Sequence, residues 1–429
     1  MGNRVTYPSY LRNSPDGGTQ SLRLYFKLGL QLKMDSSTNT SAEVIVAGAG
    51  LAGAVASAVL GQQGRRVILV DPRPSYPPVF KAEKIDQEQV HLLRKFGLLE
   101  PLLPHSGRVR EIRKAFDGRV FNTVRIEQYG ISYADMVNAL RAHVPATVEF
   151  RLGRVEDITN AGEVQRVKLA GGEQLTARLV VLASGVSREL QAKLGLRRQV
   201  LQKDQSLVFG FTIAAPESMR FAFDSVTYYS LDPSAGIDYL TLFRIRQAMR
   251  ANLFVYRSAS DPWIREFIQE PDRMLRRCLP KLEGVTGEFR VVSKVESGRV
   301  DLYRIEGDPQ PGVAMIGDAF QSVCPSTGMG LDKVLTDVDV LAECVPTWLA
   351  TPGMGTAKLA GFYNHPRKLA ADLQALHRAV YQRRAATDLS LRWRIHRSLL
   401  RLRRHFLSSL RPECGARSFT EGIAHGYGP

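Results

Sequence analysis

The sequence has 429 residues, of which 44% are hydrophobic and 23% charged, so it can bury the cores of about two or three domains or subdomains. No apolar stretch reaches the roughly 18 residues of a membrane-spanning helix. The four cysteines lie far apart and form no Cys-x-x-Cys or Cys/His cluster, so neither a zinc site nor a disulfide scaffold is indicated, and a reducing cytoplasm fits this pattern.

The net charge of +16 is concentrated near the C-terminus. Residues 381–411 contain nine arginines and one aspartate, a net +8 and half of the total. No basic motif with interleaved aromatic residues accompanies this charge. We therefore expect no nucleic-acid partner.

The first 40 residues are predicted to be disordered or an appended extension. Ser-Pro-Asp-Gly-Gly and Ser-Ser-Thr-Asn-Thr-Ser are typical of disordered segments. The run SLRLYFKLGLQLK between them is too interrupted for a signal-peptide core. Met34 is an alternative functional start, which would make residues 1–33 an addition to the folded protein.

A glycine turn follows an apolar run at residues 44–47. Its six residues are Gly48, Ala49, Gly50, Leu51, Ala52 and Gly53. A run of small residues and a second apolar run at 67–70 come next, and Asp71 ends that run. This order predicts strand, turn, helix and strand. In such a unit the first glycine makes the turn, the second lets a pyrophosphate approach, the third allows close packing, and the acid binds a ribose hydroxyl.

The middle of the chain alternates between helix and strand patterns. The expected elements are a helix at 86–99, strand-like runs at 107–130, a helix at 132–143, strands near 148–152, 164–169 and 178–183, successive strands over 205–257, helices over 261–281, and strands near 289–305. His91 lies on an amphipathic helix and is interpreted as structural.

A second glycine motif follows. A short apolar strand at 313–316 ends at Gly317 and Asp318, a loop carries Cys324 and Pro325, and Gly328, Met329 and Gly330 open an apolar helix. Such a helix would present its N-terminus, with free N–H groups and a positive dipole, to a ligand. Cys324 is interpreted as a small packing residue rather than a redox thiol.

The last 70 residues are predicted to be helical and to contain an apolar stripe at spacings of three or four. The stripe consists of Leu391, Ile395, Leu399, Leu402, Phe406 and Leu410, with most arginines off it. Two interpretations remain open. The favoured one docks the helix on the protein itself with a solvated basic face, and the alternative places the helix on an anionic membrane surface.

These motifs resemble those of the flavin-dependent aromatic hydroxylases of the para-hydroxybenzoate hydroxylase type, over roughly residues 43–350. The resemblance implies that both glycine motifs bind FAD, the first its adenosine half and the second its ribityl, pyrophosphate and isoalloxazine parts. Lys81 takes the position of a flavin-contacting arginine, with the charge but without the planar fork. The implied cofactor positions are Gly48, Ala49, Gly50, Leu51, Ala52, Gly53, Asp71, Lys81, Val155, Gly185, Gly317, Asp318, Pro325, Gly328, Met329 and Gly330.

Two positions depart from the family pattern. Ser184 replaces the aspartate of the family's middle Asp-Gly motif, which puts the nicotinamide step in doubt more than flavin binding. Asp332 stands where asparagine is common, and a carboxylate there would oppose an anionic reduced flavin. Alternatively, Asp332 is a first-turn carboxylate stabilised by the helix dipole.

The resemblance implies an α/β fold with a Rossmann-like FAD-binding domain of the glutathione-reductase type. This domain, at about 41–105, 145–200 and 300–350, is interleaved with an antiparallel β-sheet substrate domain at about 106–144 and 201–299. A basic helical segment at 351–412 and a tail at 413–429 complete the chain.

The function implied by the resemblance is that of a monooxygenase that uses FAD, NADH or NADPH, and O₂ on an electron-rich aromatic or apolar small molecule. No local motif supplies a side-chain base or nucleophile. Three tyrosines of the sheet domain are candidates for substrate activation, although aromatic residues in sheets often form the core: Tyr228, Tyr229 and Tyr239. The alternatives are a flavin-dependent prenyl-lipid reductase and a non-catalytic binding protein on the same fold.

Overall fold

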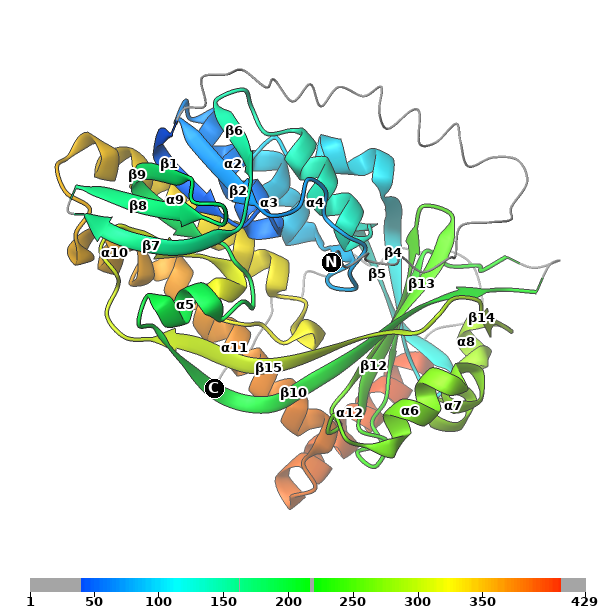
Figure 1. Ribbon diagram of the computed structural model, residues 1–429. Helices are drawn as coiled ribbons and strands as arrows, with labels where there is room; N and C mark the ends of the chain where they lie inside the picture. Colours follow the sequence, from blue (N-terminus) through cyan, green and yellow to red (C-terminus); the bar gives the residue numbers. More distant parts are fainter. Residues whose placement is uncertain (1–39, 162, 217–219, 410–429) are drawn as a thin grey trace, which may run out of the picture. The chain divides into compact units, whose positions relative to one another are not determined.

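The computed structural model describes residues 40–161, 163–216 and 220–409. The expectations for the N-terminal extension, Met34, Leu410, Cys414 and the tail lie outside these residues. The described chain forms two sheets with helices packed on them (Figure 1).

The first sheet has a parallel centre and an antiparallel edge. Its order is β6-β2-β1-β9-β8-β7, and β16 pairs with β9. The strands are β1 (Ser41–Ala47), β2 (Val67–Asp71), β6 (Val148–Leu152), β7 (Val155–Ala161), β8 (Val164–Leu169), β9 (Gln174–Leu182) and β16 (Val313–Met315). Ile45 pairs in parallel with both Ile68 and Val180, so β1 lies at the centre.

Each face of this sheet carries its own core. One face packs on α2 (Leu51–Gln62), α4 (Tyr133–Ala142) and α9 (Gly330–Ala350). The other face forms a second core with α5 (Glu189–Lys193), and the antiparallel edge strands β7 and β8 contribute apolar residues to that core. Both faces are covered because central parallel strands are apolar on both sides. This arrangement directs the C-terminal ends of β1, β2 and β16 toward the same region.

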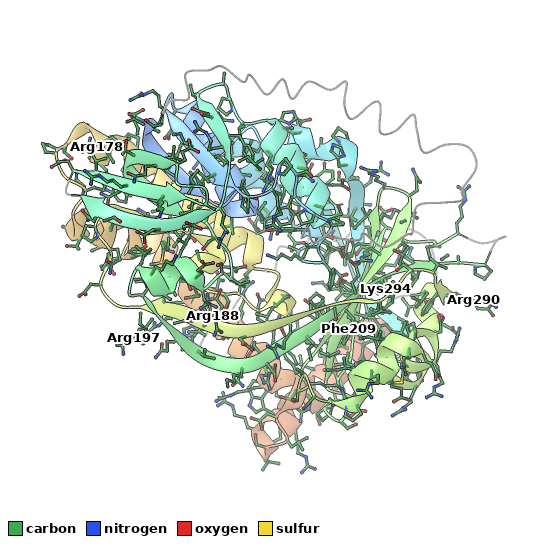
Figure 2. All side chains as sticks on the ribbon, in the orientation of Figure 1. Arg178, Arg188, Arg197, Phe209, Arg290 and Lys294 are labelled. Carbon is green, nitrogen blue, oxygen red and sulfur yellow. The ribbon has the colours of Figure 1, made fainter. Side chains whose placement is uncertain are left out.

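The second sheet has the order β14-β10-β13-β12-β11-β4-β5-β3, and β15 pairs with β10. Its strands are β3 (Lys84–Ile85), β4 (Gly107–Phe116), β5 (Arg119–Gly130), β10 (Arg197–Ala214), β11 (Ser225–Tyr229), β12 (Ile237–Ile245), β13 (Ala248–Val255), β14 (Arg290–Val291) and β15 (Glu296–Glu306). It is antiparallel except where β11 meets β4 and β12 meets β5. Phe209 of β10, labelled in Figure 2, packs against Trp263 and Phe267 of α6 (Pro262–Gln269).

Shorter helices and the C-terminal helices complete the described fold. They are α3 (Gln87–Lys95), η1 (Glu100–His105), α7 (Pro271–Cys278), α8 (Glu283–Thr286), η2 (Gly317–Ala319), η3 (Pro325–Thr327), α10 (Thr356–Tyr363), α11 (Pro366–Thr387) and α12 (Leu391–Ser409). The end of α9 is held by Arg178 of β9, which is labelled in Figure 2. Its guanidinium donates to the carbonyls of Leu349 at 2.5 Å and Thr351 at 2.6 Å.

The predicted elements agree in type and order with helices and strands of the structure, although short elements such as β3, α5 and α8 were not predicted. The helix expected over 261–281 is interrupted at Glu270, because Pro271 begins a new helix and cannot donate to the preceding turn. Strand β7 was not predicted, because its sequence VEDITNA is mostly polar. The interleaved α/β fold, with an antiparallel sheet and a helical C-terminal region, is confirmed. The exact domain boundaries stay predictions.

Helix α12 docks on the protein, as the favoured interpretation expects, but not through its apolar stripe. The stripe's five described members, Leu391, Ile395, Leu399, Leu402 and Phe406, are between 52% and 69% exposed. Helix α12 packs on the protein through a different face, where Trp393 and Arg397 are buried. The spacing identified the stripe, but it could not show which side of the helix would contact the protein.

Candidate functional site

The three glycines of the first motif have different surroundings. Gly48 has φ +105°, and a Cβ there would lie 2.6 Å from the Ala183 carbonyl oxygen. A Cβ on Gly53 would lie 1.8 Å from the Gly48 carbonyl oxygen. A Cβ on Gly50 would meet no atom closer than a Tyr76 ring carbon at 4.0 Å. The turn and the packing therefore require Gly48 and Gly53, whereas Gly50 leaves an open cradle at the N-terminus of α2, where an anion can approach.

Asp71, at the end of β2, is buried and holds this turn in place. Its Oδ2 accepts a hydrogen bond from the Ala49 amide at 2.9 Å, and its Oδ1 accepts one from the Arg73 amide at 3.0 Å. The Arg141 guanidinium of α4 lies 3.3 Å from Oδ2 and donates to the Ala49 carbonyl at 2.6 Å. Burial lowers the pKa of Arg141, and the Asp71 carboxylate opposes that shift.

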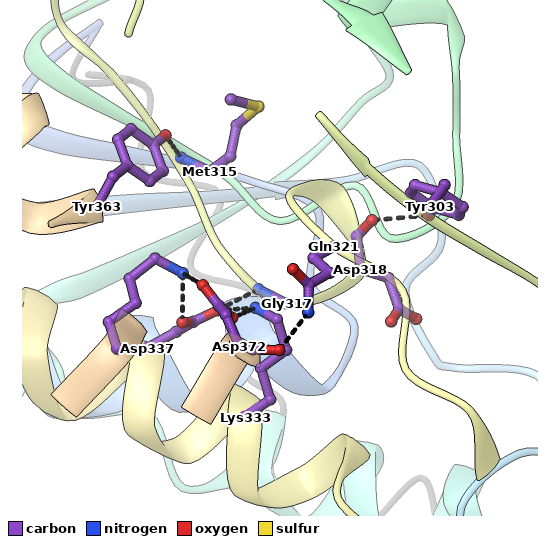
Figure 3. A network of polar contacts seen from close by, with 10 residues as sticks. Tyr303, Met315, Gly317, Asp318, Gln321, Lys333, Asp337, Tyr363 and Asp372 are labelled. Atoms are coloured by element: carbon purple, nitrogen blue, oxygen red, sulfur yellow. Dashed lines mark hydrogen bonds and ion pairs between the residues drawn. The ribbon is translucent and has the colours of Figure 1, made fainter. Parts of the chain in front are cut away.

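The second motif meets the first at the start of α2. Gly317 has φ +59°, and a Cβ there would lie 3.3 Å from Cβ of Ala52 and 3.2 Å from a methyl carbon of Val334. Its amide donates to Asp337 Oδ2 at 2.8 Å (Figure 3). Two motifs separated by more than 250 positions are thus in contact, which is what a single extended ligand bound by both would require.

Asp318 follows directly and is half-buried. Tyr303 donates its hydroxyl hydrogen to the Asp318 carbonyl at 2.8 Å, while the carboxylate has no hydrogen-bond or ion-pair partner among the described residues (Figure 3). Burial raises the pKa of this carboxyl, and the charges of Lys81, Lys333 and Arg198 oppose the shift. Asp318 is therefore available to accept hydrogen bonds from a ligand next to positive charge.

The loop after Cys324 forms the rest of this region. Gln89 of α3 joins this loop to the first turn of α9. Its Nε2 donates to the Gly328 carbonyl at 3.2 Å and to the Asp332 carboxylate at 3.0 Å. Gly328 has φ +70°, and a Cβ on Gly330 would meet no atom within 4 Å. The N-terminus of α9 is consequently open on the Gly330 side.

The carboxyl of Asp332, in the first turn of α9, has a shifted pKa. Burial and the negative charges of Asp86 and Glu88 raise its pKa to about 6, against the hydrogen bond from Gln89 and the charge of Arg378. The carboxyl is thus partly protonated near neutral pH. Cys324 is fully buried, with its Sγ 3.3 Å from Ser206 Oγ, in agreement with its interpretation as a packing residue.

The middle motif lies beside the first glycine turn. A Cβ on Gly48 would lie 3.3 Å from Cα of Ser184, and Gly185 has φ +61°. The Oγ of Ser184 is buried without a hydrogen-bond partner among the described residues. Val155 begins β7, and its side chain packs in the core of the sheet, so its contact with a cofactor stays a prediction.

The candidate tyrosines divide between the two faces of the second sheet. Tyr228 packs in the core and accepts a hydrogen bond from the Gly118 amide at 3.1 Å. Tyr239 donates to the Ser326 carbonyl in the flavin-motif loop, and its ring lies 6.0 Å from that of Tyr229. Tyr256, not singled out by the sequence, donates to Asp238 at 2.9 Å and lies 2.8 Å from Ser326 Oγ. Tyr239 and Tyr256 thus position the loop.

The sequence reasoning also missed Arg141 and Gln89. Nothing in the glycine motif indicates an arginine from a helix that lies 92 positions further along. Gln89 had a local signal, since Asp86 and Gln89 form a capping box at the start of α3. That signal predicts the cap but not the contact with the Gly328 loop.

The fold and the paired glycine motifs define a flavoprotein oxidoreductase. The chain matches the FAD binding domain family over residues 41–373 and belongs to this family. It is 24% identical over 396 residues to squalene monooxygenase of Rattus norvegicus, a match that covers 85% of this chain and 65% of that protein.

A second relative and a solved structure are also similar to this chain. It is 23% identical over 326 residues to 3-demethoxyubiquinol 3-hydroxylase of Escherichia coli, covering 71% of this chain and 80% of that protein. The crystal structure of p-nitrophenol 4-monooxygenase of Pseudomonas putida shares the fold, with a TM-score of 0.67 and 17% identity over 86% of this chain and 97% of that chain. The family match and the two curated relatives support an enzyme of the FAD-dependent monooxygenase class and fit the reductase and binding-protein alternatives less well.

Proposed function

We propose that this chain is an FAD-dependent monooxygenase that transfers one oxygen atom of O₂ to an electron-rich aromatic or apolar small molecule, with NADH or NADPH as the electron donor. The observation that carries the proposal is the contact between the two glycine motifs at Ala52 and Gly317, with open cradles at Gly50 and Gly330. The bound flavin supplies the redox chemistry and the protein supplies position and electrostatics.

The residues present fit FAD. Gly48–Gly53 and the N-terminus of α2 would hold the pyrophosphate, and Asp71 would hold the adenosine ribose. The unpartnered oxygens of Ser184 and Asp318 would pair with hydroxyl groups between the two motifs. Residues 325–330 would lie against the isoalloxazine ring, where the free N–H groups of α9 stabilise negative charge.

Lys81 supports the same assignment. Its ammonium group is 5.3 Å from the centre of the Tyr133 ring and close enough to Asp318 to oppose the rise of that carboxyl's pKa. Its side chain is exposed, so it can reach a ligand held at Asp318. An apolar substrate would partition into membranes, and contact with an anionic membrane surface through the basic C-terminal segment is part of the proposal.

The test is the spectrum and the product of the purified protein. We expect a yellow protein with non-covalent FAD that NADH or NADPH reduces under anaerobic conditions, and a substrate that gains one oxygen atom when air is admitted. Saturation of a double bond instead would identify a reductase. A colourless protein that takes up no added FAD would contradict the proposal and support a non-catalytic binding protein.

The nicotinamide step can be tested at Ser184. Because serine replaces a carboxylate in the middle motif, Ser184→Asp is expected to raise the rate of flavin reduction by NADH or NADPH in stopped-flow measurements. FAD content is measured in the same variant, because the position lies beside Gly48. An unchanged or lower rate at full FAD content would count against this account of Ser184.

A further inference from the structure

We infer that α12 is a membrane-docking helix, whose exposed apolar face lies on an anionic lipid surface. The face consists of Leu391, Ile395, Leu399, Leu402 and Phe406, called here the α12 face. The inference deepens the proposed function by naming the surface that contacts the membrane and the residues that form it.

The α12 face is continuous. At 3.6 residues per turn, its five side chains fall within an arc of roughly 80° that extends over the length of the helix. Each is more than half exposed, which is unusual for five large apolar residues on one helix. Among the described residues no helix is long and apolar enough to cross a bilayer, so the arrangement favours a helix that lies in the interface.

The opposite side of α12 is fixed to the protein. Trp393 packs on Tyr381, and Arg397 donates to the Ala385 carbonyl at 3.1 Å. Because these contacts hold the helix from the other side, the α12 face cannot turn inward without breaking them.

Arg404 adds cation–π contacts from the same side of α12. Its guanidinium carbon lies 4.2 Å from the centre of the Tyr229 ring and 5.2 Å from that of Phe121. Tyr229 also neighbours Tyr239, whose hydroxyl holds the flavin-motif loop. The docked side of α12 therefore contacts the substrate sheet, which would bring that sheet close to a membrane that holds an apolar substrate.

The charges beside the α12 face select an anionic surface. Residues 391–409 contain six arginines and no acidic residue. On the helical wheel Arg392 and Arg403 flank one edge of the face, and Arg394 and Arg401 flank the other, and all four are exposed. Long cationic side chains at the edges of an apolar face reach lipid phosphates while their stems stay in contact with it. A second copy of this chain would instead bring like charges together.

The experiment uses the full chain with FAD and measures sedimentation with vesicles. One set contains phosphatidylcholine alone and the other contains phosphatidylcholine mixed with phosphatidylserine. We expect binding to the anionic vesicles at low salt that weakens as salt is raised. The double variant Leu399→Glu, Leu402→Glu should lower the partition coefficient about tenfold or more, because it places two carboxylates in the lipid contact.

The matched control is Val292→Glu. Val292 is 59% exposed but lies next to β14, away from α12, so this variant should bind like the parent protein. FAD content and thermal unfolding should be unchanged in all variants, since every altered side chain is exposed. Arg392→Gln with Arg403→Gln should weaken binding to anionic vesicles and reduce its salt dependence.

Three results would overturn the inference: no binding to anionic vesicles at low salt, equal binding to both vesicle types, or an equal loss of binding in Val292→Glu. Self-association without vesicles that Leu399→Glu abolishes would also overturn it, by identifying the face as an interface between copies. A yellow protein that NAD(P)H reduces but that does not bind vesicles would contradict this inference and leave the proposed function intact. A colourless protein that binds anionic vesicles would contradict only the proposed function.

Discussion

Asp337 accepts a hydrogen bond from the Gly317 amide at 2.8 Å, and this contact joins the second glycine motif to a buried group of four charges. Lys333 and Lys368 each contact both Asp337 and Asp372, at distances from 2.7 to 3.1 Å. The four residues come from α9 and α11, so the turn at Gly317 is positioned by the packing of two C-terminal helices (Figure 3). The two ammonium groups hold the pKa of Asp337 below its usual range.

Removal of one charge from this group should be costly. Lys368→Met is expected to lower the free energy of unfolding by about 3–5 kcal/mol, because it leaves two buried carboxylates with one cation. Urea denaturation of the FAD-free protein measures this effect. The control is Arg367→Met, a half-exposed neighbour that pairs with Asp339 and Glu343 and should cost about 1 kcal/mol or less. An equal decrease in the free energy of unfolding in the two variants would show that the buried charges contribute no more to stability than an exposed ion pair.

The local parts of the fold and site could be predicted from the sequence. The tight turn, the close helix–strand packing and the carboxylate at the strand end are all features of one local sequence motif. Gly48, Gly53 and Asp71 could therefore be identified from the sequence around them. Arg141 and Tyr239 could not be assigned in this way, since they act on Ala49 and Ser326 through contacts that depend on tertiary packing. The docked face of α12 could not be predicted for the same reason, because it depends on an aromatic surface formed by β4, β5 and β11.

The second and third glycines of the first motif should respond differently to substitution. Gly50→Val places its side chain in open space, so we expect near-parental thermal stability and loss of bound FAD. Gly53→Ala brings a methyl carbon to within 1.8 Å of the Gly48 carbonyl and should destabilise the fold itself. Thermal unfolding of the FAD-free proteins and the flavin-to-protein absorbance ratio separate the effects. A Gly50→Val protein that purifies with full FAD would show that the pyrophosphate does not bind there.

Ser184 should contribute to the cofactor and not to the fold. Its buried Oγ lacks a partner among the described residues, so Ser184→Ala is expected to leave the stability of the FAD-free protein unchanged or slightly higher. If FAD supplies the missing partner, the dissociation constant for FAD should rise by the equivalent of about 0.5–1.5 kcal/mol. Fluorescence titration with FAD measures it. Ser57→Ala is the control, because Ser57 Oγ is equally buried and unpartnered but lies within α2. A similar change in both variants would remove Ser184 from the site.

Asp332 should make stability depend on pH between about 4 and 7. Its folded pKa of about 6 is above the ordinary value of 3.8, so folding favours the protonated carboxyl. This contribution is fully present below the unfolded pKa and is lost as pH rises through the folded pKa, at a cost of at most about 3 kcal/mol. Asp332→Asn keeps an acceptor for Gln89 and has no charge to desolvate.

The variant should therefore match the parent protein only below about pH 4 and become the more stable of the two as the pH rises, by about 1–3 kcal/mol near pH 8. Urea denaturation of both FAD-free proteins across this range gives the difference directly. Glu88→Gln is the control, because Glu88 is an exposed acid that only adds to the rise in the pKa of Asp332. It should produce a much smaller difference of the same sign. A difference between Asp332→Asn and the parent that stays constant with pH would mean that this carboxyl has the same pKa in the folded and unfolded states. It would then be ionised near neutral pH, where it would oppose an anionic reduced flavin beside the Gly328 loop.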